Sequence, residues 1–379
     1  MPEEQQSASR EVAGSAWPRY SAATTGFRNY WYPVMFSRRL GRKPVAIKLC
    51  GEPIVLVRHA GRAYALHDRC PHRGVPLSQG EQAFPGFLTC AYHGWTYDLA
   101  TGDLAAVLTD GPDSPICGKA AVRVGTYPVA ERAGLVWVYV GDQPAPPVEA
   151  DVPSELLQPG LVVEGVFQVR KGNWRYAAEN GIDEGHAKYL HRNALWAFWR
   201  KQSALTLFHM APSEDGEWLM RVRDDTIWDV TYPRLGRWPR RHPWQRRRSG
   251  TSGVGIRLPC TLLNRQKGWT GYELYVPWDE DHYLSGLLAT KRASGLEALK
   301  FRLWYRLWVR WVFHGQQNGE DQWMIELMRI PPERLYRPDV SITAWRRLCE
   351  ETARRTEAEA ASGAHCAGAA RLAAGQQAQ

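Results

Sequence analysis

The sequence predicts an α+β protein with two domains, in which an all-β domain precedes a domain of antiparallel strands and helices. A chain of 379 residues is too long for one compact core and suits two domains. Residues 31–140 hold short runs rich in Val, Ile, Leu and Tyr between Gly, Pro and Asp turns, which is typical of antiparallel β-structure. Residues 160–355 mix such runs with helical periodicity, and the prolines within residues 141–153 indicate a linker between the two halves.

These patterns give the expected boundaries. We predict a first domain over residues 17–143 and a second over residues 144–357, with a disordered N-terminus at 1–16 and a disordered, Ala- and Gly-rich tail at 358–379. The clearest strands are expected at residues 53–58, 63–66 and 134–140 in the first domain and at 161–170, 218–222, 272–276 and 283–289 in the second.

The clearest helix is expected over residues 296–313. Trp304, Trp308 and Trp311 recur there at i, i+4 and i+7, and three arginines between residues 302 and 310 form a separate stripe. The apolar stretch is far too short to span a bilayer. Attachment to a membrane surface is conceivable, but an amphipathic helix that packs its apolar stripe on a core is the commoner explanation.

Charge and cysteine content narrow the function classes. The net charge of +9 favours acidic partners in general and does not by itself indicate nucleic acid. The Arg-rich stretch at residues 238–248 is most simply a solvated loop. The seven cysteines form an odd and scattered set, which argues against a disulfide framework and for a reducing compartment. The polar N-terminus shows no signal peptide, so we expect the protein to stay in the cytoplasm.

Two short motifs, Cys70-Pro-His72 and Cys90-Ala-Tyr-His93, carry the strongest chemical signal. Two thiolates and two imidazoles at this spacing fit a [2Fe-2S] cluster of the Rieske type, in which two His replace two Cys on one iron. A structural zinc site is the alternative, since Cys2His2 is also a common zinc set. Gly74 and Gly94 favour the cluster, because its ligand loops must donate backbone hydrogen bonds to inorganic sulfides.

A second pattern lies in the predicted second domain, where His186 and His191 follow an acidic stretch. Two imidazoles and one carboxylate form the facial triad of non-haem Fe(II) oxygenases, which leaves positions open for dioxygen and substrate. In an ideal helix these two His would point roughly 140° apart, so we expect the helix to end or bulge between them. A lone His pair is a weak signal, but the electron-transfer motif beside it favours a metal site. Asp183, one helical turn before His186, can accept a hydrogen bond from the second ring nitrogen of that imidazole.

Residues 26–347 resemble the terminal oxygenase component, or α subunit, of Rieske non-haem iron oxygenases, and among them the homotrimeric members. The resemblance rests on ordered segments of the chain, at residues 26–37, 68–75, 173–175, 179–183, 275–279 and 344–347. It implies a Rieske [2Fe-2S] domain followed by an α+β catalytic domain, a helix-grip-like antiparallel sheet with helices.

The resemblance also implies which residues hold the metals. The expected ligands are Cys70, His72, Cys90 and His93 for the cluster and His186, His191 and Asp321 for a mononuclear iron. Glu320 is the alternative to Asp321, since adjacent side chains on a helix point roughly 100° apart and only one can face the metal. In the family, the residue that corresponds to Asp183 is catalytic and also reaches the cluster-bound His of a neighbouring subunit, here His93. That arrangement implies a closed homotrimer.

The implied function is that of an oxygenase which uses O2 to hydroxylate, by mono- or dioxygenation, a bulky aromatic or polycyclic small molecule. The electrons are expected from an external ferredoxin or reductase, because the sequence holds no dinucleotide-binding fingerprint. Exposed basic residues near the cluster, including Arg73, are expected to dock that donor. The substrate pocket is expected among residues close to the iron ligands in sequence, namely Asn180, Gly181, Leu190, Trp196, Phe198 and Trp199.

Three alternatives stay open at this point. One is an oxidative O- or N-demethylase of the same family. Another is a Rieske electron-transfer protein without catalytic iron, which would need only the first domain. The third is a zinc-bearing module whose basic residues 238–248 grip nucleic acid. Neither of the last two requires His186, His191 and Asp321, so the oxygenase is favoured.

Overall fold

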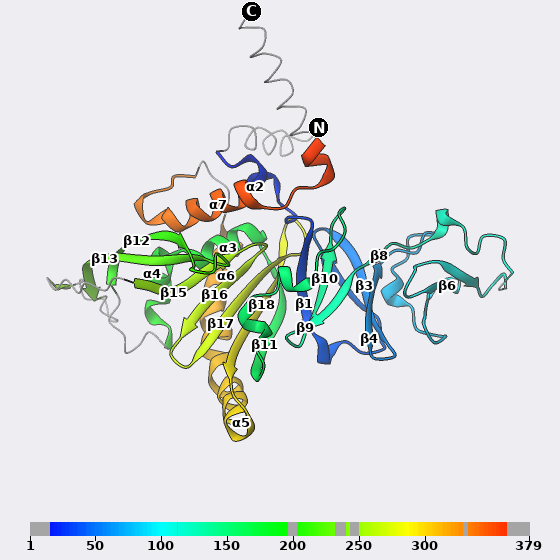
Figure 1. Cartoon of the computed structure of the whole chain (residues 1–379), viewed down its shortest axis with the longest axis horizontal. Coiled ribbons are helices and arrows are strands. Elements are labelled where there is room, and N and C mark those ends of the chain that lie inside the picture. Colours follow the sequence, from blue (N-terminus) through cyan, green and yellow to red (C-terminus); the bar gives the residue numbers. More distant parts are fainter. Residues whose placement is uncertain are drawn as a thin grey trace, which may run out of the picture. The chain divides into compact units, whose positions relative to one another are not determined.

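The computed structural model describes residues 16–111, 113–195, 203–231, 240–242, 250–328 and 333–361 (Figure 1). These residues form two compact units. The β unit comprises residues 27–32, 36–152 and the described residues from 353 on. The α+β unit comprises residues 16–26, 33–35 and the described residues within 153–352. The domain limits given above stay predictions; by their contacts, residues 144–152 group with the β unit and residues 17–26 with the α+β unit.

The described residues of the β unit form three small antiparallel sheets (Figure 1). Their strand orders are β1-β10-β9, β2-β3-β4-β8 and β5-β6-β7. The strands are β1 (Tyr30–Phe36), β2 (Val45–Leu49), β3 (Glu52–His59), β4 (Arg62–His67), β5 (Phe87–Thr89), β6 (Trp95–Asp98), β7 (Leu104–Val107), β8 (Thr126–Tyr127), β9 (Val129–Arg132) and β10 (Leu135–Val140).

Two-residue turns of one kind close three hairpins of the β unit. Both residues of each turn have positive φ, as a type I′ turn requires, and the second residue is always glycine, which adopts this conformation without a steric penalty. The pairs are Cys50-Gly51, Ala60-Gly61 and Ala133-Gly134. Because this turn matches the twist of the flanking strands, it fixes the register of β2 with β3, β3 with β4 and β9 with β10.

The core of the β unit includes the thiols of the first motif. Cys70 and Cys90 are buried in one cluster with Leu66, Leu88 and Tyr97. Fully burying an aliphatic side chain contributes roughly 1.5–3 kcal/mol, so this packing stabilises the place where the two motif loops begin.

The α+β unit is built on one antiparallel sheet of the described residues, in the order β11-β18-β17-β16-β15-β13-β12, with β14 paired to β13 (Figure 1). The strands are β11 (Leu161–Lys171), β12 (Ser203–Pro212), β13 (Leu219–Thr231), β14 (Arg240–His242), β15 (Gly250–Arg257), β16 (Thr261–Gln266), β17 (Trp269–Pro277) and β18 (His282–Arg292). The predicted α+β fold class with antiparallel sheets is confirmed.

The helices of this unit are α2 (Pro18–Ala22), α3 (Trp174–Ile182), α4 (Glu184–Tyr189), α5 (Gly295–Trp304), α6 (Asn318–Leu327) and α7 (Val340–Thr352). Helix α3 begins at Asn173, whose side chain accepts a hydrogen bond from the backbone N–H of Arg175. Helix α3 then packs against β15, β16, β17 and β18. The sheet therefore supports the segment that leads to His186.

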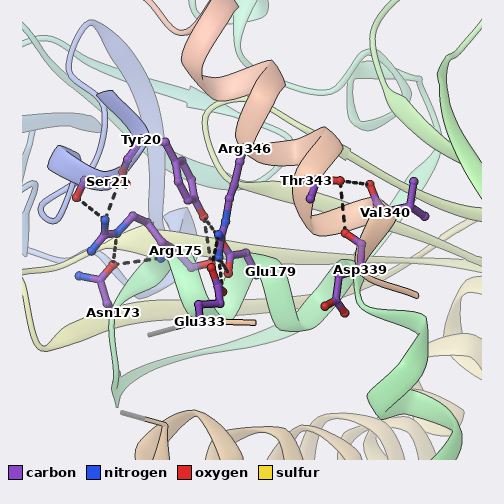
Figure 2. A network of polar contacts seen from close by, with 10 residues as sticks. All are labelled: Tyr20, Ser21, Asn173, Arg175, Glu179, Glu333, Asp339, Val340, Thr343 and Arg346. Atoms are coloured by element: carbon purple, nitrogen blue, oxygen red, sulfur yellow. Dashed lines mark hydrogen bonds and ion pairs between the residues drawn. The ribbon is translucent and has the colours of Figure 1, made fainter. Parts of the chain in front are cut away.

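A buried ion-pair network joins α2, α3 and α7 (Figure 2). Arg346 donates from Nε and Nη2 to the two oxygens of Glu179, at 2.7 and 2.8 Å, and it also pairs with Glu333. The Tyr20 hydroxyl donates to Glu179 Oε1 at 2.7 Å. Arg346 and Glu179 are both buried, and a bidentate Arg–carboxylate pair is geometrically specific. The network therefore fixes the orientation of α3 just before the metal-site residues.

The long helix confirms one expectation and corrects another. A continuous helical stretch runs from α5 through two wide, π-helical turns, Tyr305–Val309 and Val312–Gln317, into α6. Its buried face carries Phe301, Tyr305 and Val309. The predicted Trp stripe does not form the packing face, since Trp308 and Trp311 are 42% and 65% exposed. The competing i, i+4, i+8 row of residues 301, 305 and 309 faces the sheet instead.

None of the described helices is both long and apolar enough to cross a membrane. Several sequence expectations lie wholly or largely outside the described residues: the N-terminal segment, most of the predicted tail, the aromatic residues 196, 198 and 199, and most of the basic stretch 238–248.

Candidate metal centres

Three side chains from separate elements meet in the α+β unit. His186 lies in α4, His191 in the single 3₁₀ turn that follows it, and Asp321 in α6. His186 Nε2 lies 3.2 Å from Asp321 Oδ1, and His191 Nε2 lies 3.1 Å from the same oxygen. One ligand atom from each residue falls within 4.8 Å of the other two. His191 and Asp321 are buried, and His186 is partly buried.

A break in the helix allows this convergence. Asp183 caps α4, with its carboxylate oxygens accepting from the backbone N–H groups of Gly185 and His186. Helix α4 ends at Tyr189, and His191 has a non-helical backbone, with φ −87° and ψ 15°. The expected break between the two His is confirmed.

Each imidazole is also held through its other nitrogen. Asp183 Oδ2 lies 3.2 Å from His186 Nδ1, and Glu320 Oε2 lies 2.7 Å from His191 Nδ1. Hydrogen bonds of this kind orient metal-binding imidazoles and fix their tautomers. Glu320, the sequence-based alternative to Asp321, thus contacts the outer nitrogen of His191. No local pattern in the sequence indicates this second carboxylate role.

The chemistry of these groups fits a bound cation. An imidazole that donates its Nδ1 proton to a carboxylate keeps a lone pair on Nε2. Two such lone pairs would face the buried Asp321 Oδ1, which accepts no hydrogen bond of good geometry. Three converging electron-pair donors are favourable around a cation, and two imidazoles with one carboxylate form the set typical of non-haem Fe(II). The three residues therefore fit a mononuclear iron.

The pKa values of the three groups follow from the same contacts. Burial lowers the pKa of His186, but the hydrogen bond to Asp183 and the close Asp321 carboxylate outweigh it and raise that pKa to about 9. Burial also opposes charge on His191, yet contacts with Asp321 and Glu320 raise its pKa. Burial would raise the pKa of Asp321, but the two imidazoles hold it well below its usual value. The pocket thus favours positive charge beside Asp321, as protons or as a metal ion.

The two motif loops of the β unit share one backbone pattern. Cys70 N–H donates to Val75 O at 2.9 Å, and Cys90 N–H donates to Trp95 O at 2.8 Å. Four residues after each Cys, a glycine N–H donates back to the Cys carbonyl. Gly74 and Gly94 have φ of 71° and 65°, a region that favours glycine. A Cβ at Gly94 would lie 2.6 Å from Leu108 Cβ, whereas Gly74 has open space around it.

These loops bring the predicted cluster residues together. The imidazoles of His72 and His93 have ring centroids 4.4 Å apart, and His72 also stacks on Trp95. The thiols of Cys70 and Cys90 interact with one another, and burial raises the pKa of Cys70. Two buried thiols opposite two more accessible imidazoles are the donor set of a Rieske cluster.

The pocket residues expected from the sequence have different surroundings. Asn180 and Gly181 lie in α3, and Leu190 lies in the turn before His191. The backbone at Gly181 packs closely on the hydroxyl of Tyr275, since a Cβ there would overlap that oxygen. Trp196 lies outside the described residues.

A cavity that the sequence did not reveal lies between β16, β17 and the start of α6. Its lining includes Glu273, Trp269, His314 and Asn318, and Asn318 precedes Asp321 by one helical turn. Burial raises the pKa of Glu273 and lowers the pKa of His314 to about 3, so this imidazole is neutral. The sequence offers one indication of this cavity, which is that Glu273 is an acidic residue inside the otherwise uncharged strand 272–276.

Comparisons with known proteins agree with both centres. Residues 30–127 match the Rieske [2Fe-2S] domain family, and residues 139–232 match the homotrimeric ring hydroxylase family. The chain is 33% identical to the terminal oxygenase component of carbazole 1,9a-dioxygenase from Metapseudomonas resinovorans, over 88% of this chain and 93% of that protein.

Solved structures give the same result. The terminal oxygenase of carbazole 1,9a-dioxygenase from Novosphingobium sp. KA1 is similar with a TM-score of 0.75 and 29% identity, over 92% of this chain and 98% of that one. The oxygenase in the reduced oxygenase–ferredoxin complex of carbazole 1,9a-dioxygenase is similar with a TM-score of 0.75 and 28% identity, over 92% and 95%. The family inferred from the sequence is confirmed, and the chain belongs to the Rieske non-haem iron oxygenases, as a terminal oxygenase component with a [2Fe-2S] cluster and a mononuclear iron.

Proposed function

We propose that this oxygenase hydroxylates a bulky aromatic or polycyclic small molecule, by mono- or dioxygenation, with electrons from an external ferredoxin. The observation that carries the proposal is the convergence of His186, His191 and Asp321 in a chain that also holds two Rieske ligand loops. An electron carrier alone would have no use for this second donor set, so the electron-transfer alternative is not favoured.

The proposed ligands follow from the geometry above. Cys70, His72, Cys90 and His93 would hold the cluster, and His186, His191 and Asp321 would hold the iron. When bound, the cluster supplies single electrons, and the ferrous iron offers open positions for dioxygen and substrate. The carboxylates of Asp183 and Glu320 keep the Nδ1 protons of the two imidazoles in place, so that both Nε2 atoms face the metal position.

We assign Asp183 a second, catalytic role. Its carboxylate already contacts His186 and caps α4. In a trimer of the kind for which the matched ring hydroxylase family is named, the same carboxylate would hydrogen-bond the His93 imidazole of a neighbouring subunit and so couple the two centres. The partly accessible His93 imidazole supports this, because no described side chain hydrogen-bonds its ring nitrogens.

The proposed partner is an acidic ferredoxin. Solved relatives include complexes of an oxygenase with ferredoxin. Arg73 is exposed directly after His72 in the cluster loop, where it can attract an anionic protein surface. We also propose a cytoplasmic location, which the unbridged state of the described cysteines supports.

Metal analysis and oxygen uptake test the proposal. Reconstituted protein should contain about three irons per chain, two of them in the cluster. With a surrogate reductant and a panel of polycyclic aromatic compounds, at least one compound should stimulate oxygen uptake and yield a hydroxylated product. About two irons per chain and no stimulated uptake would point to the electron carrier instead. Formaldehyde release would indicate a demethylase.

A further inference from the structure

The long helix has a second apolar face, on the side opposite its packing face. A row of large apolar side chains runs along α5 and the first wide turn, and each of its last three members follows a buried residue of the packing face by two positions. Two positions correspond to roughly 200° around a helix, so this row points away from the sheet. We call it the outer row, and its members are Leu296, Leu299, Leu303, Leu307 and Trp311.

The outer row is exposed to an extent that is unusual for such side chains. Leu307 is 75% exposed, and Leu296 and Trp311 are each 65% exposed. Single exposed apolar residues are normal on a protein surface, whereas a contiguous apolar surface marks contact with another molecule or with a membrane. Packing on the sheet therefore explains only one of the two apolar faces of this helix.

Arginines flank the outer row on one side. Arg302, Arg306 and Arg310 each precede a member of the row by one residue, and adjacent side chains on a helix point roughly 100° apart. Arg302 lies 3.6 Å from the carboxylate of Glu164. Arg306 and Arg310 are exposed, and within the described part of the chain no carboxylate forms an ion pair with either of them. Their charges are thus available to an anionic partner.

Tryptophans flank the row on the other side. Trp304 and Trp308 each follow a member of the row by one residue. Trp304 is held edge to face against Trp269 of β17, with ring centroids 5.7 Å apart, and Trp308 is 42% exposed. Tryptophan is enriched where proteins meet the interface between lipid and water.

The charge balance decides between the possible partners of this face. Residues 295–311 hold four basic residues and one acidic residue. Pairing this face with that of a second copy would bring like charges together, whereas an anionic lipid surface would neutralise them. Leucine and tryptophan on one face, with arginine and lysine beside them, are also typical of helices that lie in a membrane interface.

We propose that the outer row attaches this protein to the surface of an anionic lipid membrane. The leucines and Trp311 enter the interface, and the arginines contact lipid phosphates. Apolar aromatic compounds partition from water into lipid, so attachment would bring the enzyme to the phase that holds the proposed substrates. The attachment itself does not depend on the proposed function.

Vesicle flotation tests the attachment. Full-length, metal-loaded protein is mixed with vesicles of phosphatidylcholine alone, or of phosphatidylcholine and phosphatidylglycerol in equal parts. We expect binding to the anionic vesicles to be about 10-fold stronger or more, and to weaken as salt is added. Wild-type protein that does not float with the anionic vesicles would overturn the inference, and this result needs no folded variant.

Substitutions in the outer row locate the attachment. The double variant Leu307→Glu, Trp311→Glu should lose about 10-fold or more of the vesicle binding, because it places two anions in the apolar face. Leu157→Glu is the control, since Leu157 is also an exposed leucine of the α+β unit but lies outside the row. It should bind like the wild type, and equal binding by the double variant and this control would overturn the inference.

Sedimentation without lipid tests the second copy as the partner. The double variant should form an assembly of the same size as the wild type, with the same iron content. A smaller assembly would show that the outer row is an interface between copies, and the membrane inference would then be wrong.

Discussion

The two proposed ligand sets hold their imidazoles in opposite ways. In the β unit, backbone hydrogen bonds and two left-handed glycines shape the loops, and no described side chain hydrogen-bonds the ring nitrogens of His72 or His93. In the α+β unit, carboxylates on neighbouring elements hold both outer ring nitrogens, and His191 is fully buried. The first arrangement leaves imidazoles accessible for exchange of electrons with another protein. The second orients them in advance around one metal position.

The largest effect is expected at Asp321, on which both inner nitrogens converge. Asp321→Ala should lose about one iron per chain and all measurable turnover, because two imidazoles alone bind Fe(II) weakly. The cluster absorbance should stay, since the β unit is unchanged. Metal analysis and visible spectra check this. Glu326→Ala, in the same helix, is the control, and retained iron with full turnover in Asp321→Ala would contradict the assignment.

Asp183 tests whether a side chain couples the two centres. Asp183→Asn keeps a capping oxygen for α4 and should leave both metals loaded, yet it should abolish product formation because the negative charge is lost. Asp279→Asn is the matched control, since Asp279 contacts His282 with the same i, i+3 spacing. Normal turnover in a metal-replete Asp183→Asn protein would show that the coupling role is wrong.

Glu320 tests whether a hydrogen bond from a neighbouring side chain is needed to orient the His191 imidazole. Glu320→Gln should weaken Fe(II) binding by about 10–100-fold, the usual effect of losing such a partner of a metal-bound His. Competition with a chelator measures this affinity, while the sulfide content reports that the cluster is unaffected. An unchanged affinity would mean that burial alone holds His191.

Gly74 and Gly94 test whether the backbone of the two motif loops holds the cluster residues in position. Gly94→Ala should destabilise the folded protein by about 1–3 kcal/mol and reduce the cluster content, because its Cβ would meet Leu108. Gly74→Ala suffers only the left-handed backbone penalty and should lose less. Sulfide content and thermal unfolding compare the two. Equal losses of stability and cluster content in the two variants would show that the contact with Leu108 does not contribute.

The smallest effect is expected at the accessible rim of the cluster loop. Arg73→Glu should raise the KM for the ferredoxin donor several-fold and weaken its dependence on ionic strength, because a rim charge mainly affects the encounter rate. Arg73→Lys retains the charge and should behave like the wild type. A donor KM that is the same in both variants would contradict the docking role.

Local patterns in the sequence were sufficient for much of this structure. The strands, the two motif loops that bring the four proposed cluster residues together, and the helix break before His191 all follow from spacing within a few residues. The family resemblance favours Asp321 over Glu320. The angle between adjacent side chains allows only one of the two to face the metal, but it could not show that both carboxylates reach the same imidazole. That contact joins residues 129 positions apart, so only the fold could show it.

The Trp stripe and Glu273 show where such reasoning fails. Two apolar rows compete on the long helix, and only the sheet decides that Phe301, Tyr305 and Val309 face inward. Glu273 is a single acidic residue in a strand, and nothing nearby in the sequence indicates a cavity at that position.

The two π-helical turns allow the long helix to tolerate a change in its number of residues. Such a turn accommodates one more residue than an α-helical turn, so the helix on either side keeps the same rotation about its axis. Gain or loss of one residue within Tyr305–Val309 or Val312–Gln317 can be absorbed by opening or closing a turn. The same change inside α6 would swing Asp321 by about 100°. A gain or loss of one residue before α6 therefore leaves the direction of the Asp321 carboxylate unchanged.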